Sequence, residues 1–525
     1  MRVPILPIAG TLFFSFLGTL PTYGLRQKGE SGALPRVVSL IEKGRLTEAE
    51  AALRAELQQD PKSFTAYRVL GYVYQQQHRF SDAEHALEES VRLSPDNNSQ
   101  AWFLLAQTKF ALKKPGEAVE LAGRLSAASA GDPKIHYALG RMLRENGHVR
   151  EGIAELEKAR SLSPGDPAVT TELIISYRQQ HSGAAGQLLQ PFLQTATYSD
   201  LVQAGSRMGE AGELDLAITA FRRASDLEPD RYDGRFDLAF ALFRDGRYSE
   251  ALSTLDGIPS GRSDAQADYH YLRGKIQLAL GNPRAAGEQF SIALRQQPDN
   301  ENLCVDAGLL YSKFEDLWKA LDVFHSCGQT LPDSVPVQTG VGLTCFRLGK
   351  YPEAIASFRK VLSLRPEADA AREALGFLLF ITSNFSEARQ VLEVRLRNPG
   401  VDYYLPFLDA LVLLRLDAHE NRTLALQNLE QSIKLNAKFA PAYFQRGKLE
   451  WEEGDTIRAI ADLELATKLD PAYAQPYYLM AQIYFKQGKK EEAEQAKKKF
   501  AALNREGEES EQRRDLQNRL FQSLQ

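Results

Sequence analysis

The sequence predicts an all-α fold, a solenoid of stacked helical hairpins, and three observations lead to it. A small residue recurs along the chain at steps of about 34 residues, a period typical of proteins built from repeated helix pairs. A second small residue follows twelve positions after each of these. Proline and glycine recur between them, where they would end one helix and turn the chain into the next.

The first small residue marks the first helix of each hairpin, although a larger apolar residue replaces it in a few repeats. The series is Val37, Gly71, Ala106, Gly140, Ile174, Gly205, Ala239, Gly274, Gly308, Gly342, Gly376, Leu413, Gly447 and Ala481. Its partners on the second helix are Ala49, Ala83, Ala118, Gly152, Gly186, Ala217, Ala251, Ala286, Ala320, Ala354, Ala388, Ala425, Ala459 and Ala493. Because small side chains face each other, we expect the paired helices to approach closely.

Three further residue types recur in the same register. A large apolar residue packs the second helix, and these residues are Phe221, Phe290, Phe324, Phe358, Leu87, Leu156, Leu255, Leu392, Leu429 and Leu463. Prolines close the repeats at Pro61, Pro95, Pro164, Pro229, Pro298, Pro332, Pro366 and Pro471. Glycines mark the turn inside the hairpin at Gly44, Gly147, Gly212, Gly246, Gly281, Gly349, Gly454 and Gly488.

This pattern resembles the tetratricopeptide repeat, a helix-turn-helix unit, over residues 28–505. The resemblance implies a right-handed α-solenoid, or superhelix, of about 13 or 14 repeats. One hairpin cannot bury its own apolar face, so we expect the stability to come from stacking on its neighbours.

The chain divides into five segments. Residues 1–24 are expected to be a signal peptide, because Arg2 precedes an apolar run from Ile5 to Leu20 that is short for a membrane span. The repeats are grouped as 28–198, which is irregular at 174–198, a regular central part at 199–400, and 401–505. Glycine and proline at 257–263 and after Gly376 mark two more irregularities. Residues 506–525 form a polar tail.

The signal peptide predicts an exported protein, in the periplasm or secreted. Two alternatives remain open. One is the lumen of a eukaryotic secretory pathway, for which Asn97, Asn384 and Asn421 begin glycosylation sequons. The other is anchoring in a membrane by an uncleaved amino-terminal segment. After removal of the signal, no membrane span is expected.

The tail carries Leu516, Leu520 and Leu524 at helical spacing on an otherwise polar segment. Two roles are open for it. It could cap the last repeat, since a solenoid needs a polar outer face at its end. It could instead dock a partner, including a second copy of the chain in a homo-oligomer.

In tetratricopeptide stacks, the residues three before, one after and four after the first small residue line a concave groove. The resemblance therefore assigns to a partner-binding groove Tyr72, Phe103, Phe110, Tyr137, Arg141, Arg144, Phe236, Phe240, Phe243, Tyr271, Phe346, Phe377, Phe380, Phe444, Trp451, Tyr478 and Phe485. Rings interleaved with basic residues would suit an extended peptide with apolar and acidic side chains, or a sugar. The alternative is that these rings belong to the core.

Three cysteines, Cys304, Cys327 and Cys345, lie in two adjacent repeats. Cys304 is early in one helix and Cys327 is late in its antiparallel mate, so the two share one end of a hairpin and could form a disulfide. A bridge between Cys327 and Cys345, or three buried free thiols, are the alternatives. Export would place them in an oxidising compartment.

These observations predict a non-enzymatic scaffold or adaptor of the cell envelope that binds proteins or peptides. The formal charge of −5 argues against a nucleic-acid partner, because sequence-independent binding needs a basic stripe. No cofactor or metal is expected, since histidines such as His78 and His85 match no ligand spacing. The alternative function is an accessory subunit, itself without catalysis, of an envelope enzyme or of an exopolysaccharide export machine.

Overall fold

The computed structural model describes residues 34–96, 98–258, 266–396 and 400–503. These residues form 28 helices and no strand, which confirms the all-α solenoid. The predicted signal peptide, the tail at 506–525 and the sequon residue Asn97 lie outside the described residues.

The helices group into two compact units that meet in sequence between Pro259 and Ser260. The first unit contains α3 (Leu34–Glu42), α4 (Leu46–Gln59), α5 (Phe64–Gln76), α6 (Phe80–Leu93), α7 (Ser99–Ala111), α8 (Pro115–Ala128), α9 (Pro133–Glu145), α10 (Val149–Leu162), α11 (Pro167–Gln179), α12 (Ala184–Thr195), α13 (Tyr198–Glu210), α14 (Leu214–Leu227), α15 (Tyr232–Arg244) and α16 (Tyr248–Asp256).

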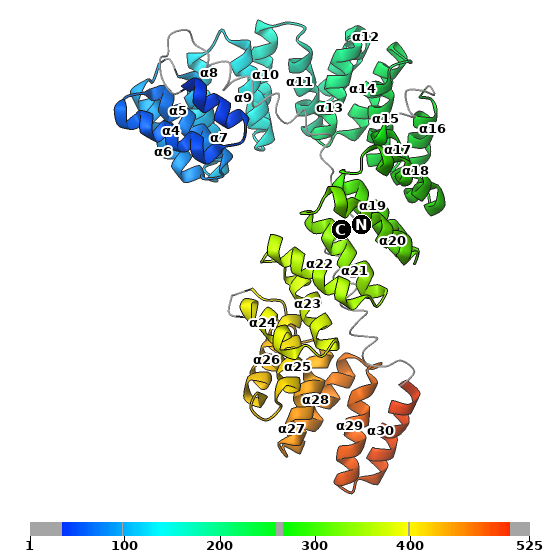
Figure 1. Ribbon diagram of the computed structural model, residues 1–525. Helices are drawn as coiled ribbons and strands as arrows, with labels where there is room; N and C mark the ends of the chain where they lie inside the picture. Colours follow the sequence, from blue (N-terminus) through cyan, green and yellow to red (C-terminus); the bar gives the residue numbers. More distant parts are fainter. Residues whose placement is uncertain (1–33, 97, 259–265, 397–399, 504–525) are drawn as a thin grey trace. The chain divides into compact units, whose positions relative to one another are not determined.

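The second unit contains α17 (Ala267–Ala279), α18 (Pro283–Gln296), α19 (Glu301–Lys313), α20 (Leu317–Thr330), α21 (Val335–Arg347), α22 (Tyr351–Leu364), α23 (Asp369–Ile381), α24 (Phe385–Leu396), α25 (Tyr404–Leu416), α26 (Arg422–Leu435), α27 (Ala440–Glu452), α28 (Thr456–Leu469), α29 (Ala474–Lys486) and α30 (Lys490–Leu503). Figure 1 shows successive helices lying side by side as hairpins within each unit.

The hairpin turns follow from the predicted glycines. All eight of them adopt a positive φ, for example 86° at Gly147 and 84° at Gly212, a conformation that costs glycine little. His78, with a φ of 57°, occupies the same turn position in another hairpin. These residues end the first helix and send the chain back along it, which accounts for the regular length of most hairpins.

Close packing inside each hairpin depends on the small residue of the first helix. A Cβ atom added to Gly205 would lie 2.7 Å from the ring of Phe221, which is nearly fully buried. At Gly140, an added Cβ would also lie 2.8 Å from the backbone oxygen of its partner Gly152. The two helices therefore touch through backbone, and the large residue of the second helix fills the space that glycine leaves.

Two of the predicted irregularities coincide with shortened second helices. Helix α12 has 12 residues and contains Pro191, whereas α14 has 14 residues. Helix α16 has only 9 residues and ends at Asp256 with Gly257 as its C-cap, shortly before residues 259–263, which are outside the described residues. The passage from the first unit to the second therefore falls where the sequence interrupts the repeat.

Replacing Gly205 by alanine is expected to lower the free energy of unfolding by about 1–3 kcal/mol, because the new methyl group overlaps the buried Phe221 ring. The measurement is urea unfolding followed by circular dichroism. Gly209→Ala, four residues later on α13, is the matched control, since an added Cβ there finds its nearest neighbour at 3.8 Å. It is expected to raise stability by up to about 1 kcal/mol through helix propensity. Equal effects of the two changes would contradict this account of the packing.

Candidate functional site

The candidate site is a set of aromatic rings on the first helices of the hairpins, and α15 shows how the sequence places them. Phe236, Phe240 and Phe243 are half-buried and follow one another at helical spacing. At about 100° per residue they form one stripe, roughly opposite Leu238. Leu238 and Leu242 are buried and belong to the core face of the helix. The ring stripe is therefore a second apolar face, distinct from the one that holds the hairpin together.

Other rings that were predicted to line the groove in the first unit are also half-buried. Tyr72, Phe103, Phe110 and Tyr137 are half-buried and pack at the margins of the local core clusters. Burial, together with the carboxylate of Glu172, raises the pKa of Tyr137 to about 12. This phenol therefore stays protonated at neutral pH and can donate a hydrogen bond.

The second unit divides the predicted rings into three classes. Four are buried and belong to the core: Tyr271, Phe346, Phe377 and Phe444. Phe380 and Trp451 are half-buried, whereas Tyr478 and Phe485 are exposed. The expectation that all of them line a groove is thus corrected for the four buried rings. The Tyr271 hydroxyl donates to Asp306 of the following first helix at 2.7 Å, and the Phe346 ring lies edge-on to Phe377 of the following first helix with centroids 6.0 Å apart.

The ring four positions after the small residue has a partner that the sequence analysis missed. Phe243 packs on Tyr248, with ring centroids 5.7 Å apart, and Phe380 packs on Phe385 at 5.8 Å. Each partner is the first residue of the second helix. The sequence does contain a signal for this pairing, because an aromatic residue stands nine positions after the small residue in both hairpins. The rings near this end of the hairpin are therefore held in pairs, which fixes their orientation.

The two arginines predicted for the groove are engaged in an ion-pair network instead. Arg144 is buried, and its Nε donates to the buried carboxylate of Glu172 at 3.0 Å. Arg207 also pairs with Glu172, and it donates to Glu145 at 2.5 Å. Arg141 donates to the same Glu145 at 2.9 Å. The network joins α9, α11 and α13, so these guanidinium groups already have carboxylate partners within the stack and are not available for an acidic peptide.

Asp237 is an acidic group that sits beside the ring stripe of α15. Burial, with the neighbouring carboxylate of Asp233, raises the pKa of Asp237 from 3.8 to about 7. A carboxyl group that titrates near neutral pH changes the charge of this surface within the physiological range.

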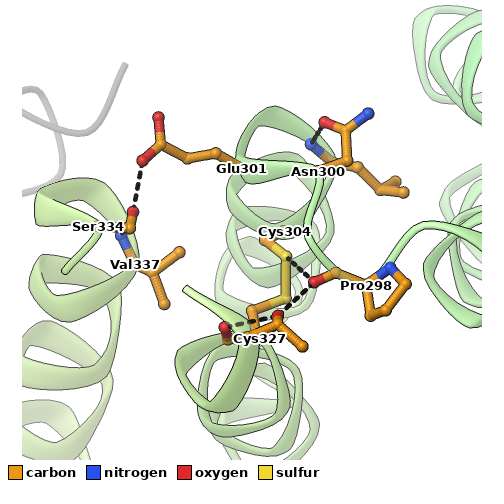
Figure 2. Close-up of a disulfide and its surroundings, with 9 residues drawn as sticks. Pro298, Asn300, Glu301, Cys304, Cys327, Ser334 and Val337 are labelled. Atoms are coloured by element: carbon orange, nitrogen blue, oxygen red, sulfur yellow. Dashed lines mark hydrogen bonds between the residues drawn. A yellow bond between two sulfur atoms is a disulfide. The ribbon is translucent and has the colours of Figure 1, made fainter. Parts of the chain in front are cut away.

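The disulfide joins Cys304 of α19 to Cys327 of α20, with the two Cα atoms 6.1 Å apart (Figure 2). Both cysteines are buried and belong to one apolar cluster with Val337 of the next hairpin. Cys345 is a free, buried cysteine, and burial, together with the carboxylate of Glu353, raises its pKa to about 11. The free thiol is therefore buried and protonated at neutral pH, and the bridge links the two helices of one hairpin.

Among the described residues, no group of His, Cys, Asp and Glu side chains is arranged to hold a metal ion. His78 and His85 are both exposed, and His78 lies in a turn. In the same parts of the chain, every helix falls short of the length and apolarity needed to cross a bilayer.

Models of known protein families match several parts of this sequence. One model, described as tetratricopeptide repeat, matches residues 40–108, 76–142, 210–276 and 450–499, and a second with the same description matches residues 342–399. The chain belongs to the tetratricopeptide repeat family. Tetratricopeptide repeat proteins generally act as protein-interaction scaffolds.

Two curated relatives show how far the similarity extends. The cellulose synthase operon protein C of Pseudomonas fluorescens is 27% identical over 247 residues, which cover 43% of this chain and 19% of that protein. A TPR repeat-containing protein of Methanocaldococcus jannaschii is 23% identical over 311 residues, which cover 49% of this chain and 54% of that protein. The chain thus spans about half of the second relative and a fifth of the first.

Solved structures with similar chains include the Cut9–Hcn1 hetero-tetramer of the APC/C and a tetratricopeptide repeat protein of Parabacteroides merdae. The first has a TM-score of 0.33 and 12% identity, and covers 90% of this chain and 98% of its own. The second has a TM-score of 0.32 and 19% identity, and covers 48% of this chain and 98% of its own.

Asp237→Asn is expected to stabilise the protein at pH 8 by about 1 kcal/mol or more, and to have little effect at pH 4. Because the folded-state pKa of about 7 lies above the ordinary value of 3.8, the folded protein binds this proton more tightly than the unfolded chain. The stability associated with the neutral carboxyl is therefore lost as the pH rises from about 4 to 7. Thermal unfolding of both proteins across this range is the measurement. A constant difference at all pH values would contradict the assigned titration.

Reduction of the Cys304–Cys327 disulfide is expected to lower the stability of its hairpin by about 3 kcal/mol, because the bridge closes a loop of 23 residues. The measurement is the thermal midpoint with and without dithiothreitol. Cys345→Ala should retain the sensitivity to reductant, whereas Cys304→Ala with Cys327→Ala should lose it. Loss of the sensitivity in Cys345→Ala would assign the bridge to a different pair.

Proposed function

We propose that this tetratricopeptide protein is a non-enzymatic scaffold of the cell envelope that binds partner proteins through the ring stripe of α15. The observation that supports this most is the second apolar face of α15, formed by Phe236, Phe240 and Phe243. The core at this helix is already made by other residues, so the stripe is not required to hold the hairpin. Aromatic rings that stay partly accessible along one face of a helix are common at protein-interaction sites.

The partner that suits this surface is an extended peptide with apolar side chains. Half-buried rings held by aromatic neighbours bind apolar groups with little loss of side-chain entropy, because their orientation is already fixed. The engagement of Arg141 and Arg144 with glutamates removes the earlier reason to expect strongly acidic peptides. Asp237 adds a negative charge beside the rings above about pH 7.

The proposed envelope location is supported by two observations. The first 24 residues have the composition of a signal peptide. The Cys304–Cys327 disulfide is of the kind that persists in oxidising compartments such as the periplasm. The eukaryotic secretory lumen and an uncleaved membrane anchor remain the alternative locations.

A second candidate function is an accessory role, without catalysis, in polysaccharide synthesis or export. The similarity to a cellulose synthase operon protein over 43% of this chain is the observation that favours it. The two proposals agree on a binding surface and differ in the identity of the partner.

Changing Phe240 and Phe243 together to serine is expected to reduce capture of the partner by about tenfold or more, since rings at the centre of an interface often contribute above 1.4 kcal/mol. The measurement is a crosslinking pull-down of the tagged protein from its native envelope, with identification of partners by mass spectrometry. Circular dichroism must show that the variant retains its helices.

The matched control is Phe314→Ser with Trp318→Ser. These two rings are 51% and 62% exposed but lie outside the predicted stripe. Capture should be unchanged in this control. If the stripe variant stays folded and captures the same partners as the wild type, the proposed surface is wrong. A synthase or export component among the selectively lost partners would favour the second candidate function.

A further inference from the structure

An acidic residue stands two positions before the small residue in three of the first helices: Glu172 on α11, Asp237 on α15 and Asp306 on α19. This position faces the first helix of the preceding hairpin. Glu172 accepts a hydrogen bond from Arg144 of α9 at 3.0 Å. Asp306 accepts one from Tyr271 of α17 at 2.7 Å. The three carboxylates therefore occupy equivalent places in the repeat, and they differ in the partners that surround them.

Two of the three carboxylates are paired with cations of the chain itself. Glu172 pairs with arginines of α9 and α13. Lys275 of α17 pairs with Asp306 at 2.9 Å, and its ammonium group also lies 5.3 Å from the centre of the Tyr271 ring. At this place in the second unit, the fold therefore holds a cation between a carboxylate and an aromatic ring.

Asp237 is half-buried, and the preceding helix supplies it with no cation. Burial raises the pKa of Tyr198 on α13, and the carboxylate of Asp237 adds to the increase, so Asp237 faces the preceding helix as its two equivalents do. On α13, the positions that correspond to the tyrosine and the lysine of α17 carry Val202 and Ser206. The Ser206 hydroxyl donates to the backbone of its own helix. Among the described residues, no hydrogen bond or ion pair involves the Asp237 side chain.

The arginines of these two helices have other partners, and neither helix contains a lysine. On α15, Arg235 and Arg244 donate to backbone oxygen atoms. The arginine of α13 belongs to the ion-pair network with α9 and α11. Arg231, directly before α15, lies over the Tyr198 ring at 4.1 Å and pairs with Asp233 at 3.7 Å. In the described part of the chain, the third carboxylate of the series is thus left without a counter-ion.

The ring stripe of α15 runs beside this carboxylate. Asp237 directly follows Phe236 and lies within one turn of Phe240, on the flank of the stripe toward α13. Both rings are half-buried, and Phe236 stacks on Tyr232 with centroids 5.3 Å apart. The faces of aromatic rings attract cations, and Lys275 shows that this fold can hold one between a ring and a carboxylate. On α15 the ring and the carboxylate are present, and the chain itself provides no cation.

We propose that the partner of the ring stripe is a peptide that places a lysine or arginine side chain against Asp237, with apolar side chains on the neighbouring rings of α15. This inference rests on the proposed function, since it names the charge of the partner that the stripe binds. The cation of the partner takes the place that Lys275 has beside Asp306. The contact also gives selectivity, because a peptide with an acidic residue at this point would bring two carboxylates together.

The test measures the binding of defined peptides to the purified full chain by fluorescence anisotropy at pH 8, where Asp237 is ionised. Each probe is a short peptide with leucines at alternate positions and one lysine, and the lysine is moved along the peptide within the set. The matched probes carry acetyl-lysine at the same place, which keeps a long side chain and removes its charge. The best lysine peptide is expected to bind at least about tenfold more tightly than its acetylated counterpart.

Two substitutions test the role of the carboxylate. Asp237→Asn should abolish the preference for lysine without weakening the binding of the acetylated peptide. Ser206→Lys should also abolish it, because it supplies from within the chain the cation that Lys275 gives to Asp306. Asp226→Asn, which removes an equal charge from an exposed position on α14, should retain the full preference. Circular dichroism must show that each variant retains its helices.

Three outcomes would overturn the proposal. Equal binding of the lysine and acetyl-lysine peptides, with both lost in Phe240→Ser with Phe243→Ser, would leave the ring stripe as a binding surface without a cation site. A preference for lysine that persists in Asp237→Asn would assign the cation to another acidic group. Absence of binding by every peptide would contradict this inference and the proposed function together. A preference that requires Asp237 but is unchanged in the double serine variant would support the cation site and show that the ring stripe is wrong.

Discussion

The close approach of the two helices in each hairpin is the constraint on which the rest of this structure depends. All four phenylalanines that pack the second helix face a glycine on the first helix: Phe221 faces Gly205, Phe290 faces Gly274, Phe324 faces Gly308 and Phe358 faces Gly342. Where the first helix carries Ala239, the facing residue is the smaller Leu255, which is also buried. Glycine also faces leucine in other hairpins, at Gly71, Gly140, Gly376 and Gly447, so a small residue on the first helix recurrently meets a large apolar residue on the second. That regularity lets hairpin after hairpin stack in the same way within each unit.

Once the small residues and their large partners have filled the hairpin, the remaining faces of the first helix determine what the protein can bind. In the second unit, Phe346 and Phe377 lie between successive first helices and are buried in the core. In the first unit, the carboxylate of Glu172 pairs with Arg144 and Arg207 and so connects the first helices α9, α11 and α13. A buried ion pair of this kind adds little net stability, but removal of one partner would leave an uncompensated charge. The network thus makes the spacing of these three helices sensitive to any change in Arg144 or Arg207.

The rings that remain accessible therefore have different origins in the two units. On α15 they form a stripe that the core does not use, and Tyr248 orients Phe243 within it. On α29 the rings are accessible because no described helix covers them. The first case suits recognition of a partner, whereas the second arises from the position of α29 in the last described hairpin. The repeat register alone does not distinguish these two cases, because it assigns the rings to equivalent positions.

The repeat register, the helical hairpins and the turn glycines were determined by the sequence alone, because each depends on residues close together along the chain. The same reasoning placed Cys304 and Cys327 at one end of a hairpin. Only the tertiary structure decided which rings are buried, since that depends on the neighbouring hairpin and not on the residue's own helix. It also decided that Arg144 pairs with Glu172, from a different repeat, and that Phe485 stays exposed while Phe346 does not. A period of about 34 residues defines equivalent positions, but equivalent positions acquire different surroundings when their neighbours differ.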